Sequence, residues 1–114
     1  MPVIKHQEIE FGKISMEGVV GASKANVIAQ REGWESHTLR VFRLEPGGHT
    51  PYHQHPWEHV NYFVGGKGEL KIGNEVHEIN VGDFAFVPPN AEHQFKNPFD
   101  KPLEFICIVP VSGA

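Results

Sequence analysis

The fold is decided by the stretch GGHTPYHQHPWEHVNYFVGG, residues 47–66. Four of the eight histidines of the chain fall within its first thirteen residues. The stretch is therefore either a solvated, turn-rich loop that carries histidine or half of a metal site. Pro51 and Pro56 bracket His53 and His55 in a segment that we expect to be extended. Because residues i and i+2 of an extended chain point to the same side, one ion could bridge both rings.

Two further histidines are candidates for the same site. His59 comes where the run VNYFV begins the next expected strand, and its neighbour Glu58 should point to the opposite side. The spacing favours His59 as the inward residue, which leaves Glu58 as a solvent-facing carboxylate or as a partner for an imidazole N–H. His93 follows a proline-asparagine turn in GDFAFVPPNAEHQFKN and starts another expected strand. It can approach the first three histidines if the strands around these turns are neighbours.

The spacing of these residues resembles the first sequence motif of the cupin superfamily, G-x5-H-x-H-x3-4-E-x6-G. The matching positions here are Gly47, His53, His55, His59 and Gly66. The departure is at the fourth position, where His59 stands in place of the usual glutamate. The chain is thus similar to small cupins that have an all-histidine site.

A second match lies further along the chain. The second cupin motif, G-x5-P-x-G-x2-H-x3-N, is matched by Gly82, Pro88, Asn90, His93 and Asn97. Asn90 replaces the middle glycine, and asparagine tolerates the left-handed backbone conformation better than most residues. The two motifs occur in the order and separation of the family and together span about half of the chain.

The resemblance implies an all-β protein, a cupin jelly-roll β-barrel of antiparallel strands, with one divalent transition metal ion per chain. It also implies the ligand set His53, His55, His59 and His93. Family resemblance favours Mn or Fe, whereas neutral imidazoles also suit Ni, Zn or Cu, so these stay open. Four ligands on an octahedral ion leave two positions for water, O2 or substrate.

The rest of the sequence is typical of short strands joined by turns. Glycine (12 residues) and proline (9 residues) interrupt most apolar runs, and no convincing helix is present. The best helical candidate is 22–30, and we give it little weight. We expect about eight to ten strands, connected by successive hairpins. Residues 34–114 should form the barrel, and residues 1–33 should be an N-terminal arm or strands of the same single domain, added to this sheet or to that of a partner.

Three residues are candidates for the lining of a pocket. Arg40 alternates onto one face with Phe42 and Leu44, so it points either inward, where it would need an anionic partner such as a substrate carboxylate, or outward over an apolar sheet face. Phe105 and Cys107 share a face of the last apolar run, LEFICIV. By analogy with cupins, that strand passes near the metal.

Composition restricts the partners. The net charge is −4 and no lysine–arginine cluster occurs, which argues against nucleic acid. No apolar run approaches a membrane span. A single cysteine and an early charged N-terminus favour a cytoplasmic protein. The resemblance to small cupins that pair through their sheets leads us to expect a homodimer.

The leading functional hypothesis is a metal-dependent enzyme, a dioxygenase-like oxidoreductase that acts on a small molecule. Isomerase or decarboxylase chemistry is an alternative, although no inward carboxylate is evident. A cupin that binds a small ligand or a metal without catalysis is a second hypothesis, because the fold alone does not establish catalysis. A protein that needs the metal only for its structure is a third.

Overall fold

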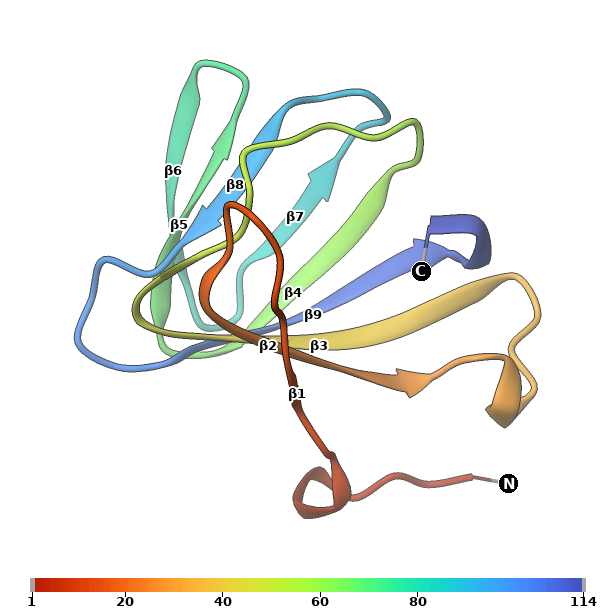
Figure 1. Cartoon of the computed structure of the whole chain (residues 1–114). Coiled ribbons are helices and arrows are strands. Elements are labelled where there is room, and N and C mark those ends of the chain that lie inside the picture. Colours follow the sequence, from red (N-terminus) through yellow and green to blue (C-terminus); the bar gives the residue numbers. More distant parts are fainter. Residues whose placement is uncertain (1, 114) are drawn as a thin grey trace.

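The fold is a curled antiparallel β-structure, as expected (Figure 1). The computed structural model describes residues 2–113. Its strands are β1 (Gly12–Lys13), β2 (Val20–Ile28), β3 (His37–His49), β4 (His59–Gly65), β5 (Lys67–Ile72), β6 (Glu75–Asn80), β7 (Phe84–Val87), β8 (His93–Lys96) and β9 (Leu103–Pro110). Three short 3-10 helices, η1 (His6–Glu8), η2 (Gln30–Glu32) and η3 (Val111–Gly113), complete the described elements. None of these helices is long and apolar enough to cross a membrane.

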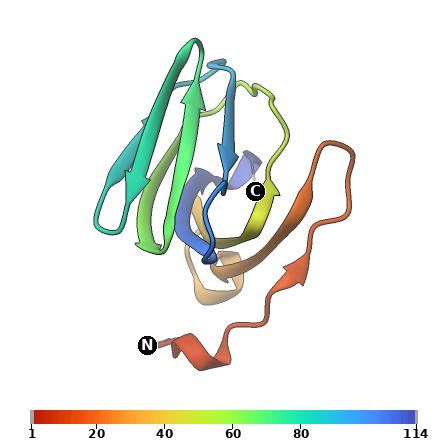
Figure 2. The ribbon, with the colours of Figure 1, turned by 90° about the vertical axis from the view of Figure 1, so that its left-hand side faces the viewer.

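Strand β3 connects two groups of strands. Along most of its length it pairs with β2 on one side and with β9 on the other, and β9 continues to β4 and β7. Its last residue, His49, pairs with Lys96 of β8, which leads on to β5 and β6. Figure 2 shows these two groups facing each other, with the β1–β2 hairpin along one side. The two inner faces enclose the core and, at one end, the histidines.

The expectation of successive hairpins is wrong for most of the connections after β3, because of these only β5 and β6 are consecutive strands that pair with each other. The glycine-rich turn at 65–66 is one example. Strand β4 pairs with β7 and β9, whereas β5 pairs with β6 and β8, so the chain crosses here from one sheet to the other. Gly66 has φ +75°, and a Cβ atom there would overlap the carbonyl oxygen of Pro102. The glycine is thus required by a sharp corner with a close backbone approach. A hairpin does form at Gly73–Asn74, between β5 and β6, where the residue types favour a tight turn.

The N-terminal segment contributes edge strands to its own sheet. The weakly favoured helix at 22–30 does not form, since β2 occupies most of these residues and pairs with β3 from Ile28↔Leu39 to Val20↔His49. Long pairing with β3 outweighs the modest helix propensity of the alanines. Strand β1 then pairs with β2.

The core follows from alternation along the strands. In β9 every second residue from Leu103 to Val109 is buried, and β4 buries His59, Asn61 and Phe63 while exposing Val60 and Tyr62. The inner faces meet in one cluster, whose buried members are Ala22, Leu44, Phe63, Leu70, Ile79, Val87, Phe95, Leu103 and Phe105. This cluster supports the barrel wall beside the histidines.

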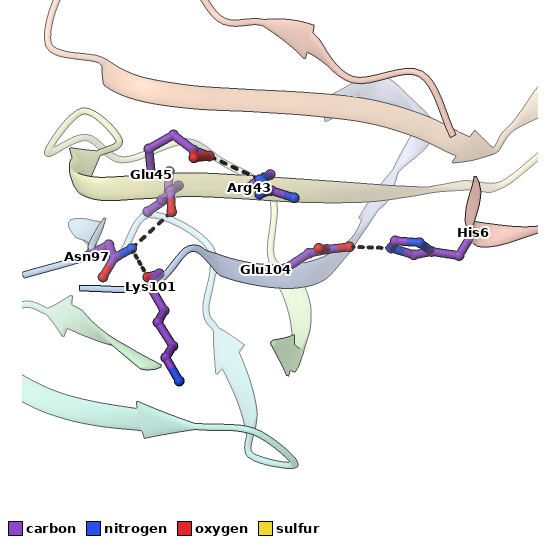
Figure 3. Close-up of polar contacts among 7 residues, drawn as sticks. His6, Arg43, Glu45, Asn97, Lys101 and Glu104 are labelled. Carbon is purple, nitrogen blue, oxygen red and sulfur yellow. Dashed lines mark hydrogen bonds and ion pairs between the residues drawn. The ribbon is translucent and has the colours of Figure 1, made fainter. Parts of the chain in front are cut away.

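Asn97 ties the chain together between β8 and β9. Its side chain is 1% exposed, and its Nδ2 donates to the carbonyl oxygens of Leu44 (3.0 Å) and Lys101 (2.7 Å), as Figure 3 shows. Its Oδ1 accepts from the backbone N–H of Phe99 at 3.1 Å. The last position of the second motif is therefore structural. It satisfies buried backbone groups where the chain leaves β8.

Candidate metal centre

His53 and His55 lie on the extended segment between β3 and β4. The backbone of His53 exchanges two hydrogen bonds with His93, at 3.1 and 2.9 Å, so this segment continues the sheet beside β8. The carbonyl of His55 accepts from the N–H of Asn90 at 2.7 Å. Asn90 has φ +67°, the left-handed conformation for which asparagine is suited. The two motifs therefore meet through backbone pairing, although they are far apart in sequence.

His93 is the centre of the histidine group. Its ring centroid lies 4.8 Å from that of His53, 5.0 Å from that of His55 and 4.9 Å from that of His59. The ligand atoms of His53, His55 and His93 all lie within 4.8 Å of one another, which is a spacing that one metal ion can bridge. His59 adjoins this trio through its contact with His93, where the two Nε2 atoms are 3.2 Å apart.

His59 points inward and Glu58 does not. His59 is 2% exposed, whereas Glu58 is half-buried and absent from the lining of the cavity around the histidines. Alternation along β4 decides this, because His59 shares its inner face with Asn61 and Phe63. His49, the remaining histidine of this stretch, is half-buried, and its Nδ1 lies 3.2 Å from the Thr50 carbonyl.

Hydrogen bonds fix the tautomers of three of the rings. The Nδ1 of His55 lies 2.8 Å from the Trp57 carbonyl, and that of His93 lies 2.9 Å from the Ala91 carbonyl. A carbonyl only accepts, so both Nδ1 atoms carry the proton. The Nδ1 of His59 lies 2.8 Å from Oδ1 of Asn61, whose Nδ2 donates to the Ile106 carbonyl. All three rings therefore present an unprotonated Nε2.

This arrangement brings two acceptor nitrogens together. With their protons on Nδ1, the rings of His59 and His93 place two unprotonated Nε2 atoms 3.2 Å apart, and neither ring can donate to the other. Two buried acceptors this close need a cation or a donor that contacts both. Imidazole nitrogens are ligands of transition metal ions, so the residues fit a bound divalent ion.

Burial favours the neutral form of His53, His59 and His93. It lowers the pKa of His59 to about 3. The hydrogen bond to Asn61 raises this pKa by a smaller amount, and the neighbouring rings of His93 and His55 lower it further. Burial also lowers the pKa of His93 and of His53. Neutral imidazole is the form that binds metal, so the site is prepared for an ion at neutral pH.

The histidines open into a cavity of about 190 Å³ between the sheets. Its lining is largely apolar, with Phe42, Phe95 and Phe105 on the wall and Trp57 stacked on His55 at a centroid distance of 4.4 Å. Residues from the β1–β2 connection, Ile14, Met16 and Val19, complete it. Among the described residues that line it, none is an aspartate or a glutamate.

All three pocket candidates from the sequence line this cavity. Arg40 points inward from β3, beside Cys107 of β9, its cross-strand partner, and the Arg40 Nη2 lies 3.3 Å from the Cys107 Sγ. Phe105 packs against Phe42 and Phe95. The sequence left the direction of Arg40 open because both faces of β3 carry apolar residues.

Sequence reasoning missed two residues of the site. Asn61 orients His59, and the signal available was the alternation that places Asn61 two residues after His59 on one face of HVNYFV. Lys24 also lines the cavity. The only hint was a period-two pattern in 20–28, which was too weak to be separated from a helix.

The chain belongs to the cupin family. The model of the cupin domain, Cupin_2, matches residues 40–109, which is more than half of the chain and contains both histidine motifs. A 1-methylthio-D-xylulose 5-phosphate methylsulfurylase of Rhodospirillum rubrum is 34% identical over 71 residues, covering 62% of this chain and 46% of that protein. The chain thus spans about half the length of this curated relative.

Solved structures agree on the fold. The polyketide cyclase RemF from Streptomyces resistomycificus superimposes with a TM-score of 0.91 at 23% identity, over 97% of this chain and 80% of that one. A protein of Thermotoga maritima described as a predicted oxalate decarboxylase gives a TM-score of 0.85 at 23% identity, over 96% of this chain and 98% of that one. Similarity at this level of identity shows the cupin fold alone.

Proposed function

We propose that this cupin is a metal-dependent enzyme of the dioxygenase-like oxidoreductase type, acting on a small molecule. The observation that supports it best is the pair of unprotonated Nε2 atoms of His59 and His93, 3.2 Å apart and beside His53 and His55, at the end of a largely apolar cavity. The ligands proposed are these four histidines. Mn or Fe is the proposed ion, one per chain, with Ni, Zn or Cu as the alternatives.

The residues of this chain have separable roles in such an enzyme. The histidines would hold the ion, while Asn61 and the carbonyls of Ala91 and Trp57 keep each proton on Nδ1 and orient the rings. The aromatic wall excludes water from the cavity. A redox-active divalent ion at this position would supply Lewis acidity and chemistry with O2.

The lining favours oxygenase over isomerase or decarboxylase chemistry. Those two reactions usually need a general acid or base close to the substrate. The described lining offers no carboxylate, and its histidines are committed to the proposed site. This is why oxygenase chemistry, in which the ion itself can act on O2 and substrate, comes first.

The test is O2 consumption by the Fe and Mn forms with a panel of diketones, phenols and alkenes. We expect one or more compounds to be turned over with stoichiometric O2 uptake, and His93→Ala to consume none. No uptake, together with a compound retained unchanged at micromolar affinity, would favour the non-catalytic binding cupin. A metal-free protein that is unfolded would favour the purely structural role.

We propose that the protein pairs with a second copy through the outer face of β9, β4 and β7. Register places Val60 opposite Ile108 and Phe86, and Tyr62 opposite Ile106 and Phe84, in two apolar rows with no charged member. Phe84 is 75% and Phe86 56% exposed. Together with the exposed Val60, Tyr62 and Val64, they present on the order of 450 Å² per copy.

Two copies packed through this face would bury about twice that area, close to the lower limit of a stable interface, before the rim is counted. Phe84→Glu should convert a dimer to a monomer in sedimentation velocity. The control is Val76→Glu, since Val76 is 60% exposed on β6 of the other sheet. A monomeric wild-type protein at micromolar concentration would contradict the proposal.

The cytoplasmic location stays a prediction from the sequence.

A further inference from the structure

The cavity carries two positive charges that the described part of the chain does not neutralise. Arg40 and Lys24 both line it, and neither forms an ion pair with an aspartate or a glutamate among the described residues. The Nε of Arg40 is buried and has no hydrogen-bond partner. Arg40 is half-buried, and a guanidinium whose Nε is removed from water without a partner is unfavourable, so this arrangement indicates a missing anion.

The side chain of Arg40 is held in place from two sides. Its Cζ lies 5.0 Å from the ring centroid of Phe42, and its Nη2 donates to the Sγ of Cys107 at 3.3 Å. Burial raises the pKa of the Cys107 thiol, more than Arg40 lowers it, so the sulfur stays neutral and does not supply the counter-charge. These contacts therefore fix the orientation of the guanidinium but do not neutralise its charge.

Lys24 is near enough to act with Arg40. On the inner face of the sheet, Lys24 of β2 is paired with Phe42, and Asn26 of β2 is paired with Arg40, which makes Lys24 a diagonal neighbour of Arg40. Burial first, and then the charge of Arg40, lower the pKa of Lys24. Lys24 is the more exposed of the two, and both residues line the cavity.

The same wall connects the cations to the histidines. In register, Arg40 is opposite Cys107, and Cys107 is opposite Asn61, whose side chain holds His59. Neighbouring strands are about 4.8 Å apart, so the backbone at Arg40 and the strand that carries His59 are two strand spacings apart, about 10 Å. A cavity of about 190 Å³ can hold one small molecule of up to about eleven non-hydrogen atoms, and such a molecule can reach both the guanidinium and the histidines.

We propose that Arg40 and Lys24 form a carboxylate subsite, and that the ligand of this cupin is a small carboxylic acid whose other end faces the histidines. The fork of a guanidinium matches a carboxylate, and Lys24 adds charge at the mouth. This inference rests on the proposed function only for the end of the ligand that faces the histidines. The carboxylate end is recognised by Arg40 and Lys24, whether or not a metal is bound.

The test uses catechol derivatives, which have two oxygens for a metal and differ at the opposite end. The protein loaded with Zn, which does not oxidise them, is titrated calorimetrically with 3,4-dihydroxybenzoate and with the neutral 3,4-dihydroxybenzamide. We expect the carboxylate to bind at least tenfold more tightly than the amide. Arg40→Gln should abolish this preference, and Lys24→Gln should reduce it, with the affinity for the amide unchanged.

The matched control is Arg43→Gln, on the same strand. Arg43 faces outward and pairs with Glu45 at 3.0 Å, so this variant should keep the full preference. Equal affinities for carboxylate and amide in the wild type, or a preference that survives Arg40→Gln, would overturn the subsite. If neither catechol binds, benzoate against benzamide on the metal-free protein decides the subsite by the same criterion, while the O2-uptake panel decides the proposed function separately.

Discussion

Replacing Asn97 by alanine should destabilise the protein by about 3 kcal/mol. The side chain is 1% exposed and makes three hydrogen bonds to backbone groups, of Leu44, Lys101 and Phe99. Each such bond contributes about 1 kcal/mol net, so the loss of all three gives the total of about 3 kcal/mol. For a domain of this size, the corresponding fall in Tm is about 10–20 °C.

The assay is urea unfolding of the metal-free protein, followed by circular dichroism, so that metal binding does not add to the measured free energy. Asn80→Ala is the matched control. Its side chain is exposed and makes one long contact, 3.5 Å to Glu78, so the loss should be within about 0.5 kcal/mol. A loss for Asn97→Ala no larger than for this control would refute the structural role of the residue.

Three further predictions concern single residues. Gly66→Ala should lower the free energy of unfolding by at least about 2 kcal/mol, and clearly more than Gly73→Ala, because the new Cβ overlaps backbone at Gly66 and meets nothing at Gly73. Equal losses in urea unfolding would contradict this. The stability of the metal-free protein should fall as the pH falls from 6.5 toward 3, and His59 should account for at most about 5 kcal/mol of this loss. The reason is that the pKa of His59 in the folded protein lies below its unfolded value, so only the unfolded chain takes up the proton in this range. A urea midpoint that does not change between pH 7 and 4 would exclude this effect of His59. The Cys107 thiol, 2% exposed and with its pKa raised by burial, should react with iodoacetamide at pH 8 only after unfolding, and rapid labelling of the native protein would show that the cavity wall opens.

The sequence was sufficient for the parts of the fold that depend on local alternation and on turns. The strand class, the β5–β6 hairpin and the left-handed Asn90 all follow from residue type and spacing. The pairing of β4 does not, because a glycine-rich turn is compatible both with a hairpin and with a corner between sheets. Only the approach of Gly66 to the backbone of Pro102 distinguishes them, and this contact is 36 positions away in sequence.

The site shows the same division. The histidines of the first motif, and His59 rather than Glu58 as the inward residue, were predictable from period two. The convergence of His93 on them depends on backbone pairing between residues 40 positions apart, which the motif match implied but no local pattern specified. The inward direction of Arg40 was not predictable at all, since it depends on which face of β3 the other sheet covers.

The most direct test is the metal content of the purified protein and of its histidine variants, measured by elemental analysis with protein from the native host included. We expect one divalent transition metal ion per chain in the wild type and less than a tenth of that in His53→Ala and in His93→Ala. His77→Ala, which alters an exposed histidine of β6, should keep full occupancy. Full metal content in His53→Ala and His93→Ala would contradict the assignment of these histidines as the metal centre.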